Sequence, residues 1–139
     1  MRADFVSNIF SPDARLKYFK WWLVIGFALI AGINFWSLTS SVWIPMPGHT
    51  DKIYHAASYA VLMLWWLQLF PSRSARVLLA VIFIAMGAAL EVLQSFNPMR
   101  YLDYADMSAN AAGVAIAFVM GCTALDQLLY RVERRILKY

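Results

Sequence analysis

The stretch "DKIYHAASYAVLMLWWLQLF", Asp51–Phe70, joins a polar beginning to a run that is apolar enough to lie in lipid. Its second part, Ala60–Phe70, carries no charged residue and contains two of the six tryptophans of the chain. An acid, a base, a histidine and a tyrosine stand directly before that run. We therefore expect a membrane helix whose first turns carry a polar function.

The composition of the whole chain favours a membrane protein. Of its 139 residues, 62% are hydrophobic and only 14% are charged. A soluble domain of this size has a large surface and needs more polar residues to cover it. No linker, low-complexity tract or internal repeat divides the chain. We expect residues 1–139 to form a single membrane domain.

Four apolar segments define the expected fold: Trp21–Leu38, Ile53–Phe70, Val77–Leu93 and Met107–Leu125. Each approaches the about 20 residues that cross a hydrocarbon core about 30 Å thick. Backbone groups in lipid must satisfy their own hydrogen bonds, which favours helices. The sequence thus predicts an all-α fold, an integral membrane four-helix transmembrane bundle. The first segment lacks an A-x-A-like site, which argues against a cleaved signal peptide.

Three further segments are expected around this bundle. An interfacial helix is predicted near Phe5–Phe10, and a short outer loop near "IPMPGHT", Ile44–Thr50. Leu125–Tyr139 is expected to extend the fourth helix as a basic, amphipathic tail.

The basic residues predict the orientation in the membrane. Ten of the twelve Lys and Arg precede the first segment, lie between the second and third, or follow the fourth. Only Lys52 and Arg100 lie on the other side. By the positive-inside rule both termini are cytoplasmic. This topology and attraction to anionic lipids account for the net charge of +4, so we expect membrane lipids and no nucleic acid as partners. The single cysteine, Cys122, excludes an intrachain disulfide.

Polar residues collect at the outer ends of the last three segments. They are Asp51, Lys52, His55, Tyr59, Glu91, Gln94, Arg100, Asp103, Asp106 and Asn110. Helical spacing places Asp51, His55 and Tyr59 on one stripe, and Asp103, Asp106 and Asn110 on another. An ionised side chain within a bilayer costs about 2.5–3.5 kcal/mol or more unless it is paired or faces water. We expect these side chains to converge, with Arg100 paired to Glu91 or Asp103 and Lys52 paired to a carboxylate.

Each of these residues also has a purely structural interpretation. Asp51, Asp103 and Asp106 suit helix N-termini, and Tyr59 suits a core. Capping, however, does not require His55 one turn inside a membrane helix. The whole set therefore favours a site.

Small residues recur every fourth position in the last segment. They are Ala109, Gly113, Ala117 and Gly121. Such a ridge lets another helix approach closely. It favours packing within the chain, with a homodimer through the same ridge as the alternative.

The ordered polar set resembles the VanZ-like family of small polytopic bacterial membrane proteins. The residues that carry the resemblance are Asp51-Lys52-x-x-His55-x-x-x-Tyr59, Glu91-x-x-Gln94 and Arg100-x-x-Asp103-x-x-Asp106-x-x-x-Asn110-x-x-Gly113. The likeness covers about residues 51–120. It implies a bacterial inner-membrane protein with a site at the extracytoplasmic end of the bundle. The association of the founding member with teicoplanin resistance does not carry over, because nothing here marks a glycopeptide ligand.

Three functional classes follow from these residues. The first is an enzyme that acts on a lipid-linked or cell-envelope substrate, with His55 as general acid or base and Glu91 or Asp106 as its partner. Lys52 and Arg100 would hold an anionic group. The second is a non-catalytic binder or transporter-like protein in which the cluster recognises a head group or relays protons. The third is a structural role in which the cluster fixes the bundle.

The candidate site residues divide by role. His55, Glu91 and Asp106 are the catalytic candidates; Asp51, Lys52, Tyr59, Gln94, Arg100, Asp103 and Asn110 are the binding candidates. A metal held by His55 with Glu91, Asp103 and Asp106 is chemically feasible, as is magnesium on the two aspartates. One histidine and scattered acids are a weak pattern, so no metal and no cofactor are expected.

Overall fold

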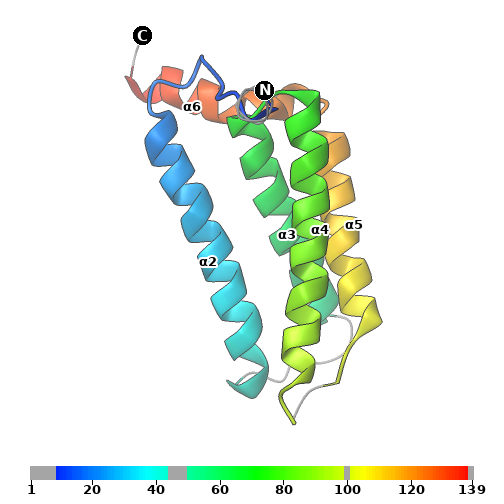
Figure 1. Ribbon diagram of the computed structural model, residues 1–139. Coiled ribbons are helices and arrows are strands. Elements are labelled where there is room, and N and C mark those ends of the chain that lie inside the picture. Colours follow the sequence, from blue (N-terminus) through cyan, green and yellow to red (C-terminus); the bar gives the residue numbers. More distant parts are fainter. Residues whose placement is uncertain (1–8, 44–49, 99–100, 138–139) are drawn as a thin grey trace, which may run out of the picture.

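The computed structural model describes residues 9–43, 50–98 and 101–137, and every regular element within these ranges is helical. The elements are α2 (Phe19–Trp43), α3 (Thr50–Leu69), α4 (Arg73–Ser95), α5 (Tyr104–Met120), the 3-10 helix η1 (Ala124–Gln127) and α6 (Leu128–Leu137). Helices α2 to α5 run along a common direction, and α6 lies across one end of them (Figure 1). The prediction of an all-helical chain is confirmed.

Two of the described helices are long and apolar enough to cross a membrane. One is Phe19–Thr39, most of α2, and the other is Arg73–Ser95, the whole of α4. Helix α5 is apolar but has 17 residues, and α3 begins with two polar turns.

Helix α3 lies at the centre of the fold, with α5 packed closely against it. A side chain at Gly113 would collide with the backbone carbonyl of Ala56, and one at Gly121 would collide with the side chain of Leu67. Ala117 between them is fully buried. The small-residue ridge of α5 is thus packed against α3 within one chain, while the homodimer through it stays a prediction.

Large apolar side chains cover the outer surface of the bundle. On α2, Trp21 and Phe35 are 68% and 69% exposed, and on α5 the exposed fraction of Val119 is 68%. Val81 of α4 is similarly open. Exposed apolar surface of this extent marks a face that another apolar phase or partner covers.

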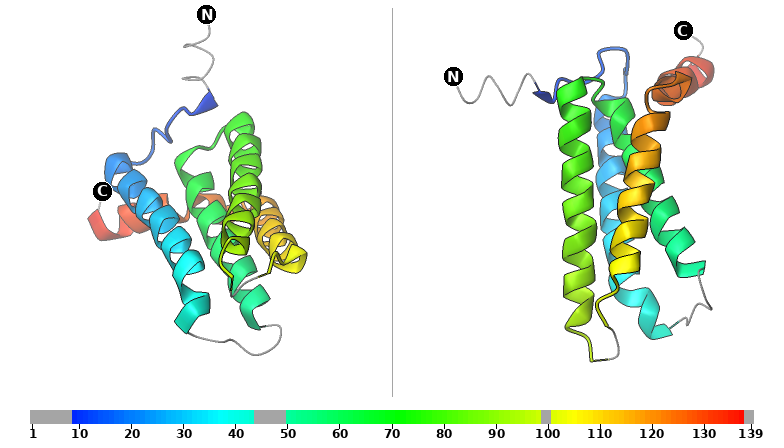
Figure 2. Two further views of the ribbon diagram at one scale, coloured as in Figure 1. Left: turned by 60° about the horizontal axis from the view of Figure 1, so that its bottom comes forward. Right: turned by 90° about the vertical axis from the view of Figure 1, so that its right-hand side faces the viewer.

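The chain does not continue α5 into its basic tail. Helix α5 ends at Met120, and the side chain of Thr123 then accepts a hydrogen bond from the amide of Leu125 at the start of η1. Arg76 Nη1 donates to the Gly121 carbonyl at 2.7 Å. The prediction that Leu125–Tyr139 extends the fourth helix is therefore wrong, because the chain turns there and α6 crosses the end of the bundle (Figure 2).

A buried carboxylate fixes α6 in this position. Glu133 is 2% exposed and accepts hydrogen bonds from the backbone amides of Lys17 and Tyr18, at 2.9 and 3.0 Å. It also accepts one from the indole of Trp22, at 2.5 Å. The amides at a helix N-terminus have no partner within the helix. Glu133 thus caps α2 from the other end of the chain.

The segment before α2 is held against the bundle by Asp13. Its amide donates to the Leu69 carbonyl at 3.0 Å, and its carboxylate accepts from Arg15 Nη2 at 2.6 Å. Burial alone would raise the pKa of the Asp13 carboxyl, but its hydrogen bonds with Arg15 outweigh burial and lower it. The interfacial helix expected at Phe5–Phe10 falls mostly outside the described residues, as does the outer loop at 44–49.

Candidate functional site

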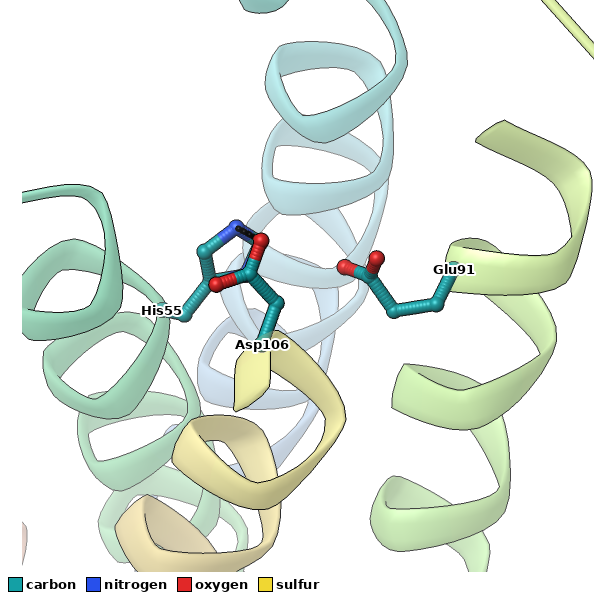
Figure 3. Close-up of side chains that lie close together, drawn as sticks. All are labelled: His55, Glu91 and Asp106. Atoms are coloured by element: carbon teal, nitrogen blue, oxygen red, sulfur yellow. Dashed lines mark ion pairs between the residues drawn. The ribbon is translucent and has the colours of Figure 1, made fainter. Parts of the chain in front are cut away.

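The polar residues of three helices meet at the end of the bundle opposite α6. The N-terminal turns of α3 and α5 and the C-terminal turns of α4 come together there (Figures 1 and 2). Figure 3 shows His55 from α3, Glu91 from α4 and Asp106 from α5 facing one another.

His55, Glu91 and Asp106 form the centre of this cluster. One nitrogen or oxygen atom of each lies within 4.8 Å of the corresponding atoms of the other two. His55 Nε2 is 3.7 Å from Asp106 Oδ2. Glu91 is 2% exposed and Asp106 is also buried, whereas the His55 side chain keeps 18% of its surface. Three ionisable groups from three helices therefore share one small, mostly enclosed volume.

Asn110 determines how the imidazole of His55 is oriented. Its Oδ1 lies 3.1 Å from His55 Nδ1. An amide oxygen can only accept a hydrogen bond, so Nδ1 carries the proton and donates it. The other ring nitrogen, Nε2, is thereby directed to Asp106. Asn110 itself is buried at 2% exposure, which holds this arrangement in place.

Lys52 lies beside the centre and is surrounded by acids. Its Nζ is 2.9 Å from Asp106 Oδ1, 3.0 Å from Asp103 Oδ2 and 3.7 Å from Asp51 Oδ2. Hydrogen bonds to Asp106 and Asp103 raise the pKa of Lys52. The hydrogen bond from Lys52, in turn, lowers the pKa of Asp103. The expected pairing of Lys52 with a carboxylate is confirmed, and Lys52 forms ion pairs with three of them.

Asp103 has a structural task as well. Its side chain accepts a hydrogen bond from the Ala105 amide at 2.7 Å and caps the N-terminus of α5. Asp51 stands in the first turn of α3, where a carboxylate is favourable next to the helix dipole. Both acids belong to the rim of the cluster and not to its centre.

Of the remaining predicted members, Gln94 is placed elsewhere, Tyr59 lies next to the centre, and one is not described. Gln94 donates to the Ser37 carbonyl and to Ser37 Oγ, at 2.8 and 2.6 Å, and so ties α4 to α2. Tyr59 is buried one turn along α3 from His55. Arg100, with its predicted pairing to Glu91 or Asp103, lies outside the described residues.

Gly87 is a site residue that sequence reasoning missed. A Cβ atom there would come within 3.1 Å of Asn110 Cβ and 3.3 Å of the Tyr59 ring. The glycine therefore makes room for the residue that orients His55. Its position one turn before Glu91, within an otherwise regular helical segment, was the available signal.

An open groove lies at the other end of the molecule, between α2 and α6. It encloses about 400 Å³ and is lined mainly by aromatic and aliphatic side chains: Tyr18, Trp21, Trp22, Ile25, Glu133 and Ile136. It shares no residue with the cluster around His55 and takes no part in the site.

Comparison of the chain with protein-family models, curated proteins and solved structures finds no match.

Proposed function

We propose that the chain is a VanZ-like integral membrane protein that crosses the bacterial inner membrane four times with both termini in the cytoplasm. The exposed apolar surface of α2, α4 and α5 supports this, as do the two helices of sufficient length. At about 1.5 Å per residue the 17 residues of α5 extend about 25 Å, close to the hydrocarbon thickness. The basic residues at the end that carries α6 favour a cytoplasmic position for that end.

The cluster around His55 would then act on, or bind, the polar head group of a lipid-linked or cell-envelope substrate. The observation that carries this proposal is the convergence of His55, Glu91 and Asp106 from three helices within 4.8 Å. Ionisable side chains placed together at the mouth of a membrane bundle are expensive and mark functional sites. His55 keeps some exposure, which leaves one edge of the centre accessible to a head group.

The charges in the cluster bear on whether Lys52 can bind an anionic group. The described part contains four carboxylates, listed here as Asp51, Glu91, Asp103 and Asp106, and one ammonium group. Because Lys52 is engaged by three of these acids, it is poorly placed to hold a phosphate alone. The binding of an anionic group by Lys52 therefore receives less support than the sequence suggested.

A structural role is favoured by one specific contact. Lys52 joins α3 to α5 through Asp103 and Asp106. These pairs are partly exposed, because the side chains of Lys52 and Asp103 keep 28% and 45% of their surface, so each contributes only about 0–1 kcal/mol. Lys52 and its acids would therefore contribute modestly to holding α3 against α5.

The test compares His55→Gln with Ser108→Ala, a change at an exposed position of α5. Each protein is purified in lipid nanodiscs and incubated with a lipid extract of bacterial inner membranes, and bound and released lipids are identified by mass spectrometry. We expect the wild type and Ser108→Ala to retain or convert a lipid species that His55→Gln does not. Identical lipid profiles for all three folded proteins would contradict the proposal.

A further inference from the structure

The nitrogen of His55 that faces Asp106 has no proton of its own in the neutral ring. Nδ1 carries the proton and donates it to Asn110, at 3.1 Å, so Nε2 presents a lone pair. This lone pair is directed at Asp106 Oδ2, 3.7 Å away, and a carboxylate oxygen of Glu91 is within 4.8 Å. With a neutral ring, three electron-rich atoms thus face one another, an arrangement that suits a cation between them.

The separations suit a metal ion better than a shared proton. A hydrogen bond between nitrogen and oxygen has a length of about 2.7–3.2 Å, and the 3.7 Å between Nε2 and Oδ2 exceeds it. Two ligands of one zinc ion, each about 2.0–2.2 Å from the metal, lie about 3.3–3.6 Å apart in a tetrahedral site. An ion at the centre would require the side chains to move inward by less than about 1 Å.

The types of ligand indicate which metals fit. Calcium and magnesium take oxygen ligands, whereas imidazole nitrogen suits zinc and other first-row transition metals. Two carboxylates and a neutral imidazole balance the charge of a divalent ion. Three protein ligands leave one coordination position open, as in zinc sites that bind a water molecule or a substrate.

Two polar neighbours of the centre, Asn110 and Lys52, each contact a proposed ligand through the atom that would not bind the metal. Asn110 fixes Nδ1 of His55 and leaves Nε2 directed inward. Lys52 holds Oδ1 of Asp106, at 2.9 Å, and leaves Oδ2 directed inward. Outer partners of this kind orient the ligands of protein metal sites. Two of the three ligands, His55 on α3 and Asp106 on α5, are therefore positioned in advance.

Tyr59 adds an independent observation. It is 2% exposed, its hydroxyl has no hydrogen-bond partner among the described residues, and it lies close enough to Glu91 for the two groups to interact electrostatically. Buried hydroxyl groups without a partner are uncommon. A water molecule or substrate oxygen on the open position of an ion would supply the missing partner.

We infer that His55, Glu91 and Asp106 bind one divalent transition-metal ion of the zinc type, with Asn110 and Lys52 as positioning residues. The inference reverses the expectation of no metal that the sequence alone supported. It does not depend on the proposed head-group function, since ion binding is measured without a substrate. If both hold, the ion would be the group that meets the head group, and His55 would serve as its ligand.

The test uses the full chain, purified without a histidine tag and stripped with a chelator. Zinc, cobalt and magnesium are titrated separately by calorimetry, and the cobalt complex is followed by its visible absorption. We expect one zinc or cobalt ion per chain, no comparable magnesium binding, and a cobalt spectrum of low coordination number. The ¹⁵N resonance of His55 Nε2 should shift on zinc binding.

Variants connect this binding to the three side chains. His55→Gln and Glu91→Gln should each weaken zinc binding by more than about 100-fold, and Asn110→Ala by about 10–100-fold. Ser108→Ala, at an exposed position of α5, is the control and should leave the affinity unchanged. Asp103→Asn removes a carboxylate next to Lys52 that is not one of the three ligands, so it should weaken zinc binding much less than His55→Gln or Glu91→Gln does. Circular dichroism and size-exclusion chromatography establish that each variant is folded.

Several outcomes would overturn the inference. Absence of zinc binding by the wild type would do so, as would unchanged binding in folded His55→Gln or Glu91→Gln. Equal losses in Asp103→Asn and Asp106→Asn would show general attraction to an acidic surface. If the ligand variants do not fold, the wild-type titration and the His55 resonance decide. The two proposals can also fail separately. If the wild type binds no metal but still differs from His55→Gln in the lipid assay, the metal inference is wrong and the head-group function stands.

Discussion

Asn110 Oδ1 accepts the Nδ1 proton of His55 at 3.1 Å, and this contact determines which ring nitrogen faces Asp106. The two residues lie 55 positions apart, on α5 and α3. Gly87 on α4 makes the space that Asn110 occupies. Residues on α5 and α4 thus determine which nitrogen of His55, on α3, faces Asp106.

The first prediction concerns the protonation of this ring. In the wild-type protein at neutral pH, the neutral His55 ring should carry its proton on Nδ1. Asn110→Ala removes the acceptor and should yield a mixture of both forms. Nitrogen-15 NMR of the histidine side chains distinguishes them, with His49→Gln used to assign the two signals. A neutral wild-type ring with its proton on Nε2 would contradict the assignment.

The second prediction tests the contact between α3 and α5. Gly113→Ala places a methyl group against the Ala56 carbonyl and should lower the free energy of unfolding by about 1–3 kcal/mol. Gly32→Ala in α2 is the control, because nothing lies within 4 Å of the added atom. It should raise stability by up to about 1 kcal/mol through helix propensity. Thermal unfolding in detergent compares them, and equal effects would refute the close packing.

The third prediction concerns the attachment of α6. Glu133→Ala leaves the amides of Lys17 and Tyr18 and the Trp22 indole without their acceptor. These hydrogen bonds are partly buried, and one to a charged group contributes about 1.5–3 kcal/mol, so the variant should be clearly destabilised. Hydrogen exchange should increase at the start of α2 and along α6.

Arg134→Ala is the matched control for Glu133→Ala. It changes the next residue of the same helix, at an exposed position, and should alter stability by less than about 0.5 kcal/mol. If both variants exchange hydrogen alike, Glu133 does not fix α6 to the bundle.

The fourth prediction concerns pH. Because the folded-state pKa of Asp13 is lower than its ordinary value of 3.8, its contribution to stability is present above that value. It is lost as the pH falls through the lowered, folded-state pKa. Thermal unfolding is measured between about pH 5 and about pH 2, the range in which carboxyl groups titrate. As the pH falls, Asp13→Asn should lose less stability than the wild type. The same acid sensitivity in both proteins would exclude Asp13 as its source.

The main helices could be predicted from the sequence because their cause is local. Apolar runs of sufficient length end at charged or turn-forming residues, and the structure places α3 and α4 within a few residues of the expected limits. The path after Met120 could not be predicted in this way. It depends on hydrogen bonds between Glu133 and residues 115 and 116 positions earlier, which no local pattern encodes.

The candidate site could be predicted where helical spacing alone determines which face of a helix a side chain occupies. His55, Asp106 and Asn110 share the faces that their spacing assigns, and the structure brings them together. Gln94 shows the limit of this reasoning. Three residues of α-helix turn a side chain by about 60° from that of Glu91. This rotation is enough to direct Gln94 to Ser37 on α2, and only the packing of the four helices reveals it.

The cap that Glu133 provides for α2 has a consequence for biosynthesis. Lys17 and Tyr18 are translated more than a hundred residues before the carboxylate that accepts their amide protons. Throughout the synthesis of α2 to α5, the turn that leads into α2 therefore has no carboxylate from this source. The contact forms only after all four helices have been made and α6 has reached the same end of the bundle. A chain that stops before residue 133 therefore lacks the acceptor that these two amides have in the folded protein.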